Sequence, residues 1–297
     1  SLFWKLILTP PQDLVISFTS PPLIGFLGTL FCKLKGGRSV QWLMDINPDS
    51  AIAVGYLKKN GLIARSLNAV FDFTLRASSF IVVLDRWMKR KVIDHGAATE
   101  KVVIAAPWSV FVPEKTGLSE KVEAFKKEWG LKGKFVVLFS GNHSVVHPLD
   151  TVLETAKKLE SQKDIMFVFA GAGLRTQQVL DFKQSHQLEN ILQIPWQPRE
   201  KVAASFGSAD LHCVVMGEKM SGLVHLSKIY SVLASGKPFV FVGPSQCHVC
   251  DLEEGIASDL FVEHGRADAL SAAILRAKAF SDEEKEKIAD RSFAQVS

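Results

Sequence analysis

The chain has 297 residues, which suggests two domains of about 150 residues each, and its content of 47% hydrophobic and 22% charged residues excludes a disordered protein. Its four cysteines are scattered, which fits a reducing compartment better than a disulfide framework. The net charge of +4 is uneven, because residues 1–130 hold 17 basic and 11 acidic side chains. This basic half favours an anionic lipid or acceptor, although an ordinary solvated surface also explains it. Basic residues are not interleaved with aromatic ones, so no nucleic acid is expected.

Residues 14–31 contain no charged side chain and reach the lower limit of a membrane-spanning helix. The β-branched run and the pair Pro21-Pro22 favour instead a strand, a turn and then a helix. The opening residues lack the features of a signal peptide. We therefore expect a cytoplasmic protein whose N-terminal domain makes peripheral contact with the inner face of the plasma membrane.

Strands and helices alternate along the first half. Strands are expected at 13–18, 39–45, 80–85 and 101–107, helices at 22–34 and 86–95, and amphipathic stretches at about 50–59 and 62–78. The polar helical run at 117–134 is interpreted as the entry to a second domain.

The second half repeats the pattern more regularly. Strands are expected at 135–139, 164–171, 189–194, 210–215, 237–243 and 259–263, and helices at 149–160, from 174, at 198–207, 227–235 and 266–279. Nearly continuous β-branched strands that alternate with helices predict a parallel, doubly wound α/β sheet. Ligands bind beyond the carboxyl ends of such strands, where Gly141, Gly171 and Gly243 fall.

Several stretches carry a family resemblance: SFTSPPLIGFLG, WLMDINPDSAIAVGYL, SGNHSVVHPLDTVLETAKKL, FVFAGAGLRTQ, NILQIPWQPREKVAASFGSADLHCV and GLVHLSKIYSVLASGKPFVFVGP. They resemble the retaining family-4 glycosyltransferases, and most closely the subgroup of bacterial O-antigen, capsule and exopolysaccharide synthesis. The resemblance spans nearly the whole chain.

The resemblance implies the GT-B fold, in which two Rossmann-like domains with doubly wound parallel sheets face each other across a cleft. Residues 1–116 would form an acceptor-side domain, incomplete because several βα units precede Ser1 in the family, and residues 117–297 the nucleotide-sugar domain. The implied reaction moves a sugar from an NDP-sugar to a lipid-linked or glycan acceptor, without a cofactor or a metal.

The donor diphosphate would bind at two loops of the second domain. By resemblance, the implied residues are Gly141, Asn142, His147, Ser227 and Lys228. Asn142 and His147 stand where the commoner family pattern has Arg and Lys. His147 is a cationic phosphate ligand if its pKa rises beside the anion, or else it caps or packs the helix start. Lys228 is a compact cation for phosphate, or a solvated surface lysine.

The base and ribose would lie against neighbouring loops. The implied residues are Gly171, Gly173, Trp196, Gln197 and Ser231. The two glycines let the backbone approach the nucleotide or simply turn the chain, and Trp196 packs on the base or is structural. The usual family pattern has two glutamates eight residues apart, and Leu223 and Ser231 occupy those positions. Ser231 would bind a ribose more weakly, and Glu218 is a substitute nearby.

The acceptor side of the cleft would be formed by Ser20, Pro21, Asp45 and Asp49. Asp45 is the predicted catalytic residue, which orients the acceptor or the donor sugar or acts as a base. Asp49 is a second choice, or the cap of the following helix. Retaining chemistry in this family is thought not to require a protein nucleophile, so none is assigned.

Two alternative functions remain open: a catalytically inactive subunit that binds a nucleotide or glycan, favoured by the missing glutamates, and a sugar-nucleotide 2-epimerase of the same fold. Two metal motifs are weak. His143 and His147 form an H-x3-H pair without a third ligand, and Cys247-x-x-Cys250 lacks a second ligand pair and a βαβ redox context.

Overall fold

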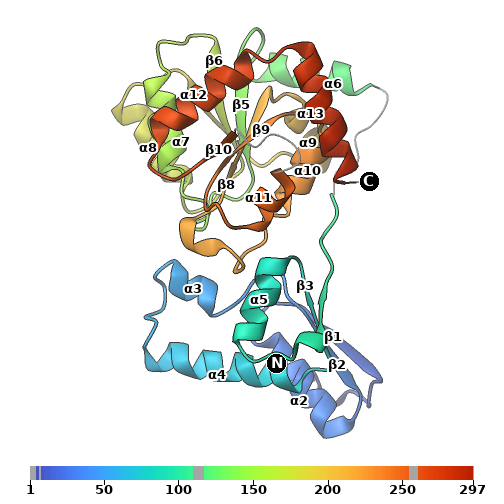
Figure 1. Cartoon of the computed structure of the whole chain (residues 1–297). Coiled ribbons are helices and arrows are strands. Elements are labelled where there is room, and N and C mark those ends of the chain that lie inside the picture. The colour runs from blue at the N-terminus through green and yellow to red at the C-terminus, as the bar shows by residue number, and fades with distance from the viewer. Residues whose placement is uncertain (1–4, 7, 110–116, 254–259, 297) are drawn as a thin grey trace. The chain divides into compact units, whose positions relative to one another are not determined.

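The computed structural model describes residues 5–6, 8–109, 117–253 and 260–296. The chain divides into a first unit, Ser1–Pro107 with Lys219–His225, and a second unit, Trp108–Glu218 with Leu226–Ser297. The sequence places the boundary after residue 116, whereas this division places it after Pro107 and assigns the later segment 219–225 to the first unit. Both units are α/β (Figure 1).

The first unit contains a parallel four-stranded sheet in the order β1-β2-β3-β4. The strands are β1 (Leu14–Ser17), β2 (Arg38–Trp42), β3 (Phe80–Val83) and β4 (Val102–Ile104), and the helices are α2 (Ile24–Lys35), α3 (Asp49–Ala53), α4 (Leu62–Ala77) and α5 (Arg86–Asp94), with a 3-10 turn at Thr99–Lys101. The expected stretch 50–59 is shorter than predicted, because the chain turns at Gly55 with a φ of 84°.

The core of the first unit lies between its sheet and α4 and α5. Leu75, Ile81 and Met88 are fully buried there. Leu223, from the later segment 219–225, is part of the same cluster, and its carbonyl accepts a hydrogen bond from the N–H of Ile46 at 2.8 Å. The structure therefore makes Leu223 a core residue of the first unit.

The second unit contains six parallel strands in the order β10-β9-β8-β5-β6-β7. Its strands are β5 (Phe135–Ser140), β6 (Ile165–Ala170), β7 (Ile191–Ile194), β8 (Leu211–Val215), β9 (Phe239–Val242) and β10 (Phe261–Val262). Its helices are α6 (Leu118–Glu128), α7 (Asp150–Lys158), α8 (Thr176–Ser185), α9 (Arg199–Gly207), α10 (Lys228–Ala234), α11 (His248–Glu253), α12 (Ala267–Lys278) and α13 (Asp282–Ala294). The strand order reverses beside β5, the type of position where doubly wound sheets bind ligands.

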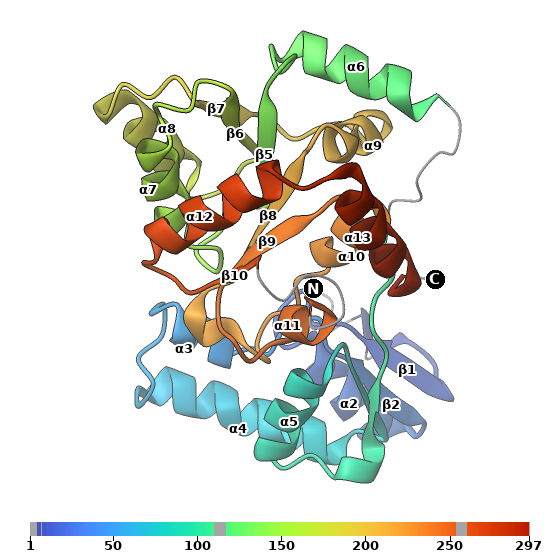
Figure 2. The same cartoon turned by 45° about the horizontal axis from the view of Figure 1, so that its top comes forward.

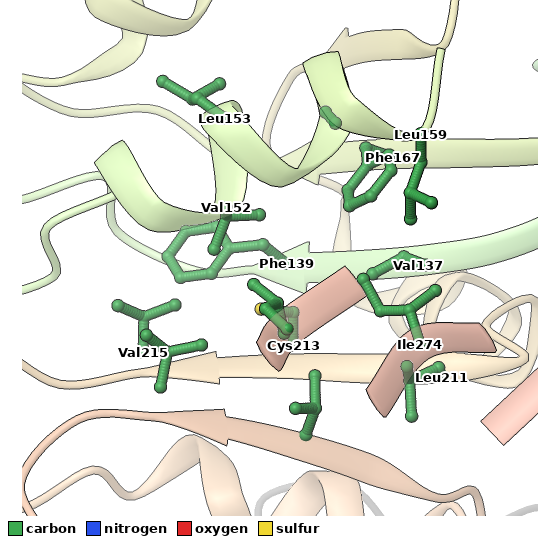
Figure 3. Packing of buried hydrophobic residues seen from close by; sticks show 14 of the residues in the cluster. Val137, Phe139, Val152, Leu153, Leu159, Phe167, Leu211, Cys213, Val215 and Ile274 are labelled. Carbon is green, nitrogen blue, oxygen red and sulfur yellow. The ribbon is translucent and has the colours of Figure 1, made fainter. Parts of the chain in front are cut away.

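Both faces of the second sheet are buried. Val137 and Phe139 pack toward α7 and α12, as Figure 3 shows, whereas Val136 and Leu138 pack toward α6 and α9. In Figure 2, α7 runs beside α12, and α6 beside α9. Burial on both faces explains why these strands are nearly continuous apolar runs rather than alternating ones.

Two helices were not predicted from the sequence, α11 and α13. Helix α13 begins with a capping box, in which the Ser281 hydroxyl accepts from the N–H of Glu284 and the Glu284 carboxylate accepts from the N–H of Ser281. Among the described helices, none has the length and apolar character needed to cross a bilayer.

Candidate functional site

The loops that follow β5 and β6 pack backbone against backbone. The N–H of Gly141 donates to the Ala170 carbonyl at 2.9 Å, and the N–H of His143 donates to the Ala172 carbonyl at 3.0 Å. A Cβ on Gly171, at a φ of 132°, would lie well inside contact distance of the Gly141 carbonyl oxygen. The structure thus gives Gly171 a packing role, and its predicted approach to a nucleotide stays a prediction.

Gly173 serves the same packing. A Cβ at this position would lie 2.5 Å from Oδ1 of Asn142 and 2.6 Å from the carbonyl oxygen of His143. Any larger residue would collide with the loop that follows β5. Asn142 itself is exposed and accessible to a ligand, as its predicted role requires.

Lys228 is the first residue of α10, and its side chain reaches the end of β5. Its Nζ lies 4.1 Å from the centroid of the Phe139 ring and 3.5 Å from the position that a Cβ on Gly141 would occupy. The Nζ is buried, and it has no hydrogen-bond partner among the described residues. Burial lowers the pKa of Lys228 to about 8. The alternative of a solvated surface lysine is therefore wrong.

His147 is buried and neutral. Burial, followed by the charge of Lys228, lowers its pKa to about 3. Since the ring is neutral, its Nδ1 must carry the hydrogen that is donated to the Val215 carbonyl at 2.9 Å. The structure does not support the predicted cation at this position, because the ring packs beside Phe139 instead, as the alternative held. A role as a neutral phosphate ligand remains a prediction.

His143 is a site residue that the sequence analysis considered only as a metal ligand. It is fully buried, and its Nδ1 lies 3.2 Å from the Thr176 hydroxyl. Its Nε2 is buried without a hydrogen-bond partner among the described residues. Burial and the charge of Lys228 lower the pKa of His143 to about 4. Because the same lysine also acts on His147, its positive charge opposes the binding of a metal ion between the two imidazoles. The sequence feature that could have identified His143 as a site residue is its position directly after Gly141-Asn142.

The predicted residues around the base and ribose differ in accessibility. Trp196 is 57% exposed, and the side-chain amide of Gln197 donates to the Pro195 carbonyl at 2.8 Å. Ser231 is buried, and its hydroxyl oxygen lies 3.3 Å from that of Ser109. Ser227 and Glu218 are exposed. The exposed ring of Trp196 is accessible for stacking on a base, whereas the Ser231 hydroxyl would have to give up its contact with Ser109 to bind a ribose.

Asp45, in the first unit, lines an apolar pocket. The pocket has a volume of about 250 Å³, and its walls include Phe18, Leu23, Phe26 and Phe71. Asp45 forms an isolated backbone bridge with Val224, and burial raises the pKa of its carboxyl group. The neighbouring Thr19 and Pro22 line the pocket, while the predicted Ser20 and Pro21 are exposed residues outside this lining.

Asp49 is occupied by a different partner. Its carboxylate lies 3.0 Å from Nε2 of His95, whose Nδ1 lies 2.7 Å from the Asp72 carboxylate. The hydrogen bond to Asp49 is the main cause that raises the pKa of His95, and the ring joins α3, α4 and α5 through its two carboxylate partners. Pro48 holds the N-cap position of α3, without a side-chain cap. The helix-cap interpretation of Asp49 is therefore wrong.

Two units with parallel sheets, and a buried amine at the switch point of one of them, define an α/β protein of the doubly wound class, which binds ligands beyond the carboxyl ends of its strands. The sequence model of the family Glycosyl transferases group 1 matches residues 121–292, more than half of the chain. The chain belongs to this family, and the predicted resemblance is confirmed.

Two curated relatives are similar over most of the chain. The putative colanic acid biosynthesis glycosyl transferase WcaI of Escherichia coli (strain K12) is 27% identical over 269 residues, which are 86% of this chain and 65% of that protein. The probable glycosyltransferase WbjE of Pseudomonas aeruginosa is 26% identical over 235 residues, which are 77% of this chain and 57% of that protein. The chain thus spans about three fifths of the length of these relatives.

Solved structures confirm the fold class. Anabaena Alr3699/HepE in complex with UDP and glucose has a TM-score of 0.74 at 13% identity, covering 96% of this chain and 73% of that chain. A UDP-forming α,α-trehalose-phosphate synthase from Burkholderia vietnamiensis has a TM-score of 0.70 at 14% identity, covering 98% and 72%. These are GT-B proteins, so the predicted α/β GT-B fold class is confirmed.

Proposed function

We propose that the chain carries the donor site of a glycosyltransferase, which moves a sugar from an NDP-sugar to a lipid-linked or glycan acceptor in cell-surface polysaccharide synthesis. The family and the names of the relatives support this class of activity. The resemblance further suggests a retaining hexosyltransferase. Because HepE was solved with UDP, a uridine nucleotide is the first donor to test.

The observation that carries the proposal is the buried amine of Lys228. A buried cation without a partner is costly, and the fold retains one at the carboxyl end of β5, where Nζ has no hydrogen-bond partner among the residues that the structure describes. Two neutral imidazoles, those of His143 and His147, lie close enough for its charge to lower their pKa values, and no carboxylate among the described residues contributes to the pKa of Lys228. A departing diphosphate fits this arrangement, because it develops negative charge where the amine stands. Lys228 would then do the work of a metal, so none is required.

The first unit supports a lipid-linked acceptor. Its pocket is mostly apolar and has one carboxylate, that of Asp45, in its lining. An acceptor with a hydrocarbon part and a hydroxyl group would match both features. Such an acceptor would bring the protein to the cytoplasmic face of a membrane as a peripheral protein.

The test compares a nucleoside diphosphate with a nucleoside. Calorimetry with UDP and with uridine should show that Lys228→Ala weakens UDP binding by about ten- to a hundredfold and leaves uridine binding nearly unchanged. Lys287→Ala, on the exposed side of α13, is the matched control and should change neither affinity. Equal UDP affinity of Lys228→Ala and the unaltered chain would overturn the diphosphate role.

An inactive nucleotide-binding subunit is the second candidate. Leu223 is a core residue and Ser231 is buried, so neither supplies the carboxylate of the usual family pattern. Assays of UDP-sugar hydrolysis separate the two candidates. Nucleotide binding without turnover would favour the inactive subunit.

A further inference from the structure

Cys247 and Cys250 bring two thiols into contact in the second unit. Their Sγ atoms are 3.8 Å apart, and each thiol donates to the Pro244 carbonyl, at 3.5 Å from Cys247 and 3.4 Å from Cys250. The N–H of Asp251 donates to the carbonyl of Cys247, so the two cysteines stand one helical turn apart on the same side of the chain. This spacing suits an intramolecular disulfide.

We propose that Cys247 and Cys250 form a reversible dithiol–disulfide pair, a modification site that reacts with low-molecular-weight disulfides such as oxidised glutathione. Cys250 is partly exposed and can meet the reagent, whereas Cys247 is fully buried and its sulfur contacts that of Cys250. The exposed sulfur therefore reacts first, and the buried sulfur resolves the intermediate.

The reaction proceeds in two exchanges. The Cys250 thiolate attacks one sulfur of the small disulfide, forms a mixed disulfide and releases one small thiolate. The Cys247 thiolate then attacks the Cys250 sulfur, forms the internal disulfide and releases the second small thiolate. Both protein thiols lose their protons, the pair is oxidised by two electrons, and the small disulfide is reduced to two thiols.

The other two cysteines provide an internal contrast. Burial raises the pKa of Cys213 to about 12 and also raises that of Cys32, which lowers the reactivity of both thiols. At Cys247 the hydrogen bond with Cys250 lowers the pKa despite burial. Because Cys250 is partly exposed and lies 3.8 Å from Cys247, whereas Cys32 and Cys213 are buried, selective oxidation of the pair is expected in the folded chain.

The pair also lies next to the donor loop, a consequence that rests on the proposed function. Nε2 of His248, between the two cysteines, accepts a hydrogen bond from the N–H of Leu226 at 3.1 Å, and Leu226 precedes Ser227 and Lys228. A sulfur–sulfur bond is shorter than the present contact of 3.8 Å by roughly 1.8 Å, so its formation must reorient the two cysteine side chains on either side of His248.

The first test is mass spectrometry of the folded chain in oxidised glutathione. Trypsin releases the peptide 229–266, which holds both cysteines of the pair and no other, because Lys237 precedes a proline. This peptide should become lighter by two hydrogen atoms and recover with dithiothreitol, while Cys32 and Cys213 still alkylate after unfolding. A pair that stays reduced while Cys32 or Cys213 reacts would overturn the proposal.

Variants test the order of the two steps. Cys247→Ser should accumulate a glutathione mixed disulfide at Cys250, whereas Cys250→Ser should take up no glutathione at the buried Cys247. Equal glutathione uptake by both variants would contradict the assigned roles. The first test uses the unaltered chain, so it stands even if a variant fails to fold.

The link to the donor loop has its own readout. UDP affinity of the oxidised chain should differ at least about threefold from that of the reduced chain. Equal affinities would overturn the link and leave the disulfide result intact. Absence of UDP binding in both forms would instead refute the proposed function.

Discussion

The ammonium group of Lys228 lies 4.1 Å above the ring of Phe139. A ring face attracts a cation, but more weakly than a carboxylate would in the same buried place. Among the described residues nothing accepts a hydrogen bond from this Nζ, and burial brings its pKa to about 8. The charge at the end of β5 is therefore sensitive to pH near neutrality and to the presence of an anion.

UDP affinity should fall as the pH rises through about 8. Above this pH, Lys228 is uncharged in the unliganded chain, and it must take up a proton when the anion binds. This proton uptake weakens UDP binding by up to about tenfold per pH unit. Calorimetry between pH 7 and 9.5 measures the slope. Lys228→Arg is the control, because a guanidinium stays charged and should flatten the profile. A constant affinity in the unaltered chain would contradict the assigned lysine.

Lys228→Met should stabilise the unliganded protein. The pKa of Lys228 in the folded chain, about 8, lies below the ordinary 10.5. The buried charge therefore destabilises the folded chain fully below pH 8, and this destabilisation disappears as the pH rises from 8 to 10.5. The variant should exceed the unaltered chain by up to about 3 kcal/mol at pH 7, and the gain should vanish toward pH 10.5. Urea unfolding at several pH values checks this, and equal stability at pH 7 would argue against a buried ammonium.

Gly171→Ala should disrupt the donor site. Its methyl group would collide with the Gly141 carbonyl, at a φ of 132° that already disfavours a side chain. We expect a loss of about 2 kcal/mol or more in unfolding free energy and a clear loss of UDP binding. Gly133→Ala is the matched control, because Gly133 also has a positive φ but has open space around it. Similar losses in both variants would show that φ alone matters.

His95→Gln should destabilise the first unit in a pH-dependent way. Because the pKa of His95 is raised in the folded chain, its contribution to the free energy of unfolding is complete below pH 6.5. This contribution is lost as the pH rises through the pKa of the folded state. Because the pKa of Asp49 is lowered, its contribution to the free energy of unfolding is present above pH 3.8 and is lost as the pH falls through the pKa of the folded state. Asp72 is the second carboxylate, and Lys59, Lys91 and Arg76 are the nearby cations.

The difference in unfolding free energy between His95→Gln and the unaltered chain should therefore peak between about pH 4 and 6.5, at roughly 1 kcal/mol because the three side chains are partly exposed. Urea unfolding between pH 4 and 9 measures it. His186→Gln, whose ring contacts the Phe182 carbonyl, is the control and should show no such peak. A difference that grows toward pH 9 would have the wrong sign.

Asp45→Asn should reduce turnover without changing UDP affinity. Burial raises the pKa of Asp45, so the acid limb of the turnover profile should lie above the ordinary carboxyl range. A panel of UDP-sugars in a hydrolysis assay should show a fall of about a hundredfold or more. Asp94→Asn, at the exposed end of α5, serves as control. Unchanged hydrolysis would remove Asp45 from the chemistry.

The sequence predicted what depends on local pattern. Periodicity located the strands and most helices, whereas the family resemblance singled out Lys228, whose diphosphate role stays a prediction. Helix α13 was missed although the run from Ser281 to Glu284 has the capping pattern, because its polar sequence gives a weak apolar period.

Other features could not be predicted because they arise from contacts between distant segments. Asp49 meets His95 across 46 residues, and Leu223 joins a core that is formed mainly by residues before 107. The sequence marked Gly171 as a turn residue, but only the structure shows that it faces the carbonyl of Gly141. Likewise the burial of His143 decides its protonation, and no motif encodes burial at a single position.

The buried amine of Lys228 also bears on protein engineering. A library selected only for heat resistance would favour apolar replacements at position 228, since each would remove a buried charge from the fold. The variants enriched by such a selection would be more stable to heat but would no longer bind a diphosphate. Screens on this chain should therefore include a nucleotide from the first round.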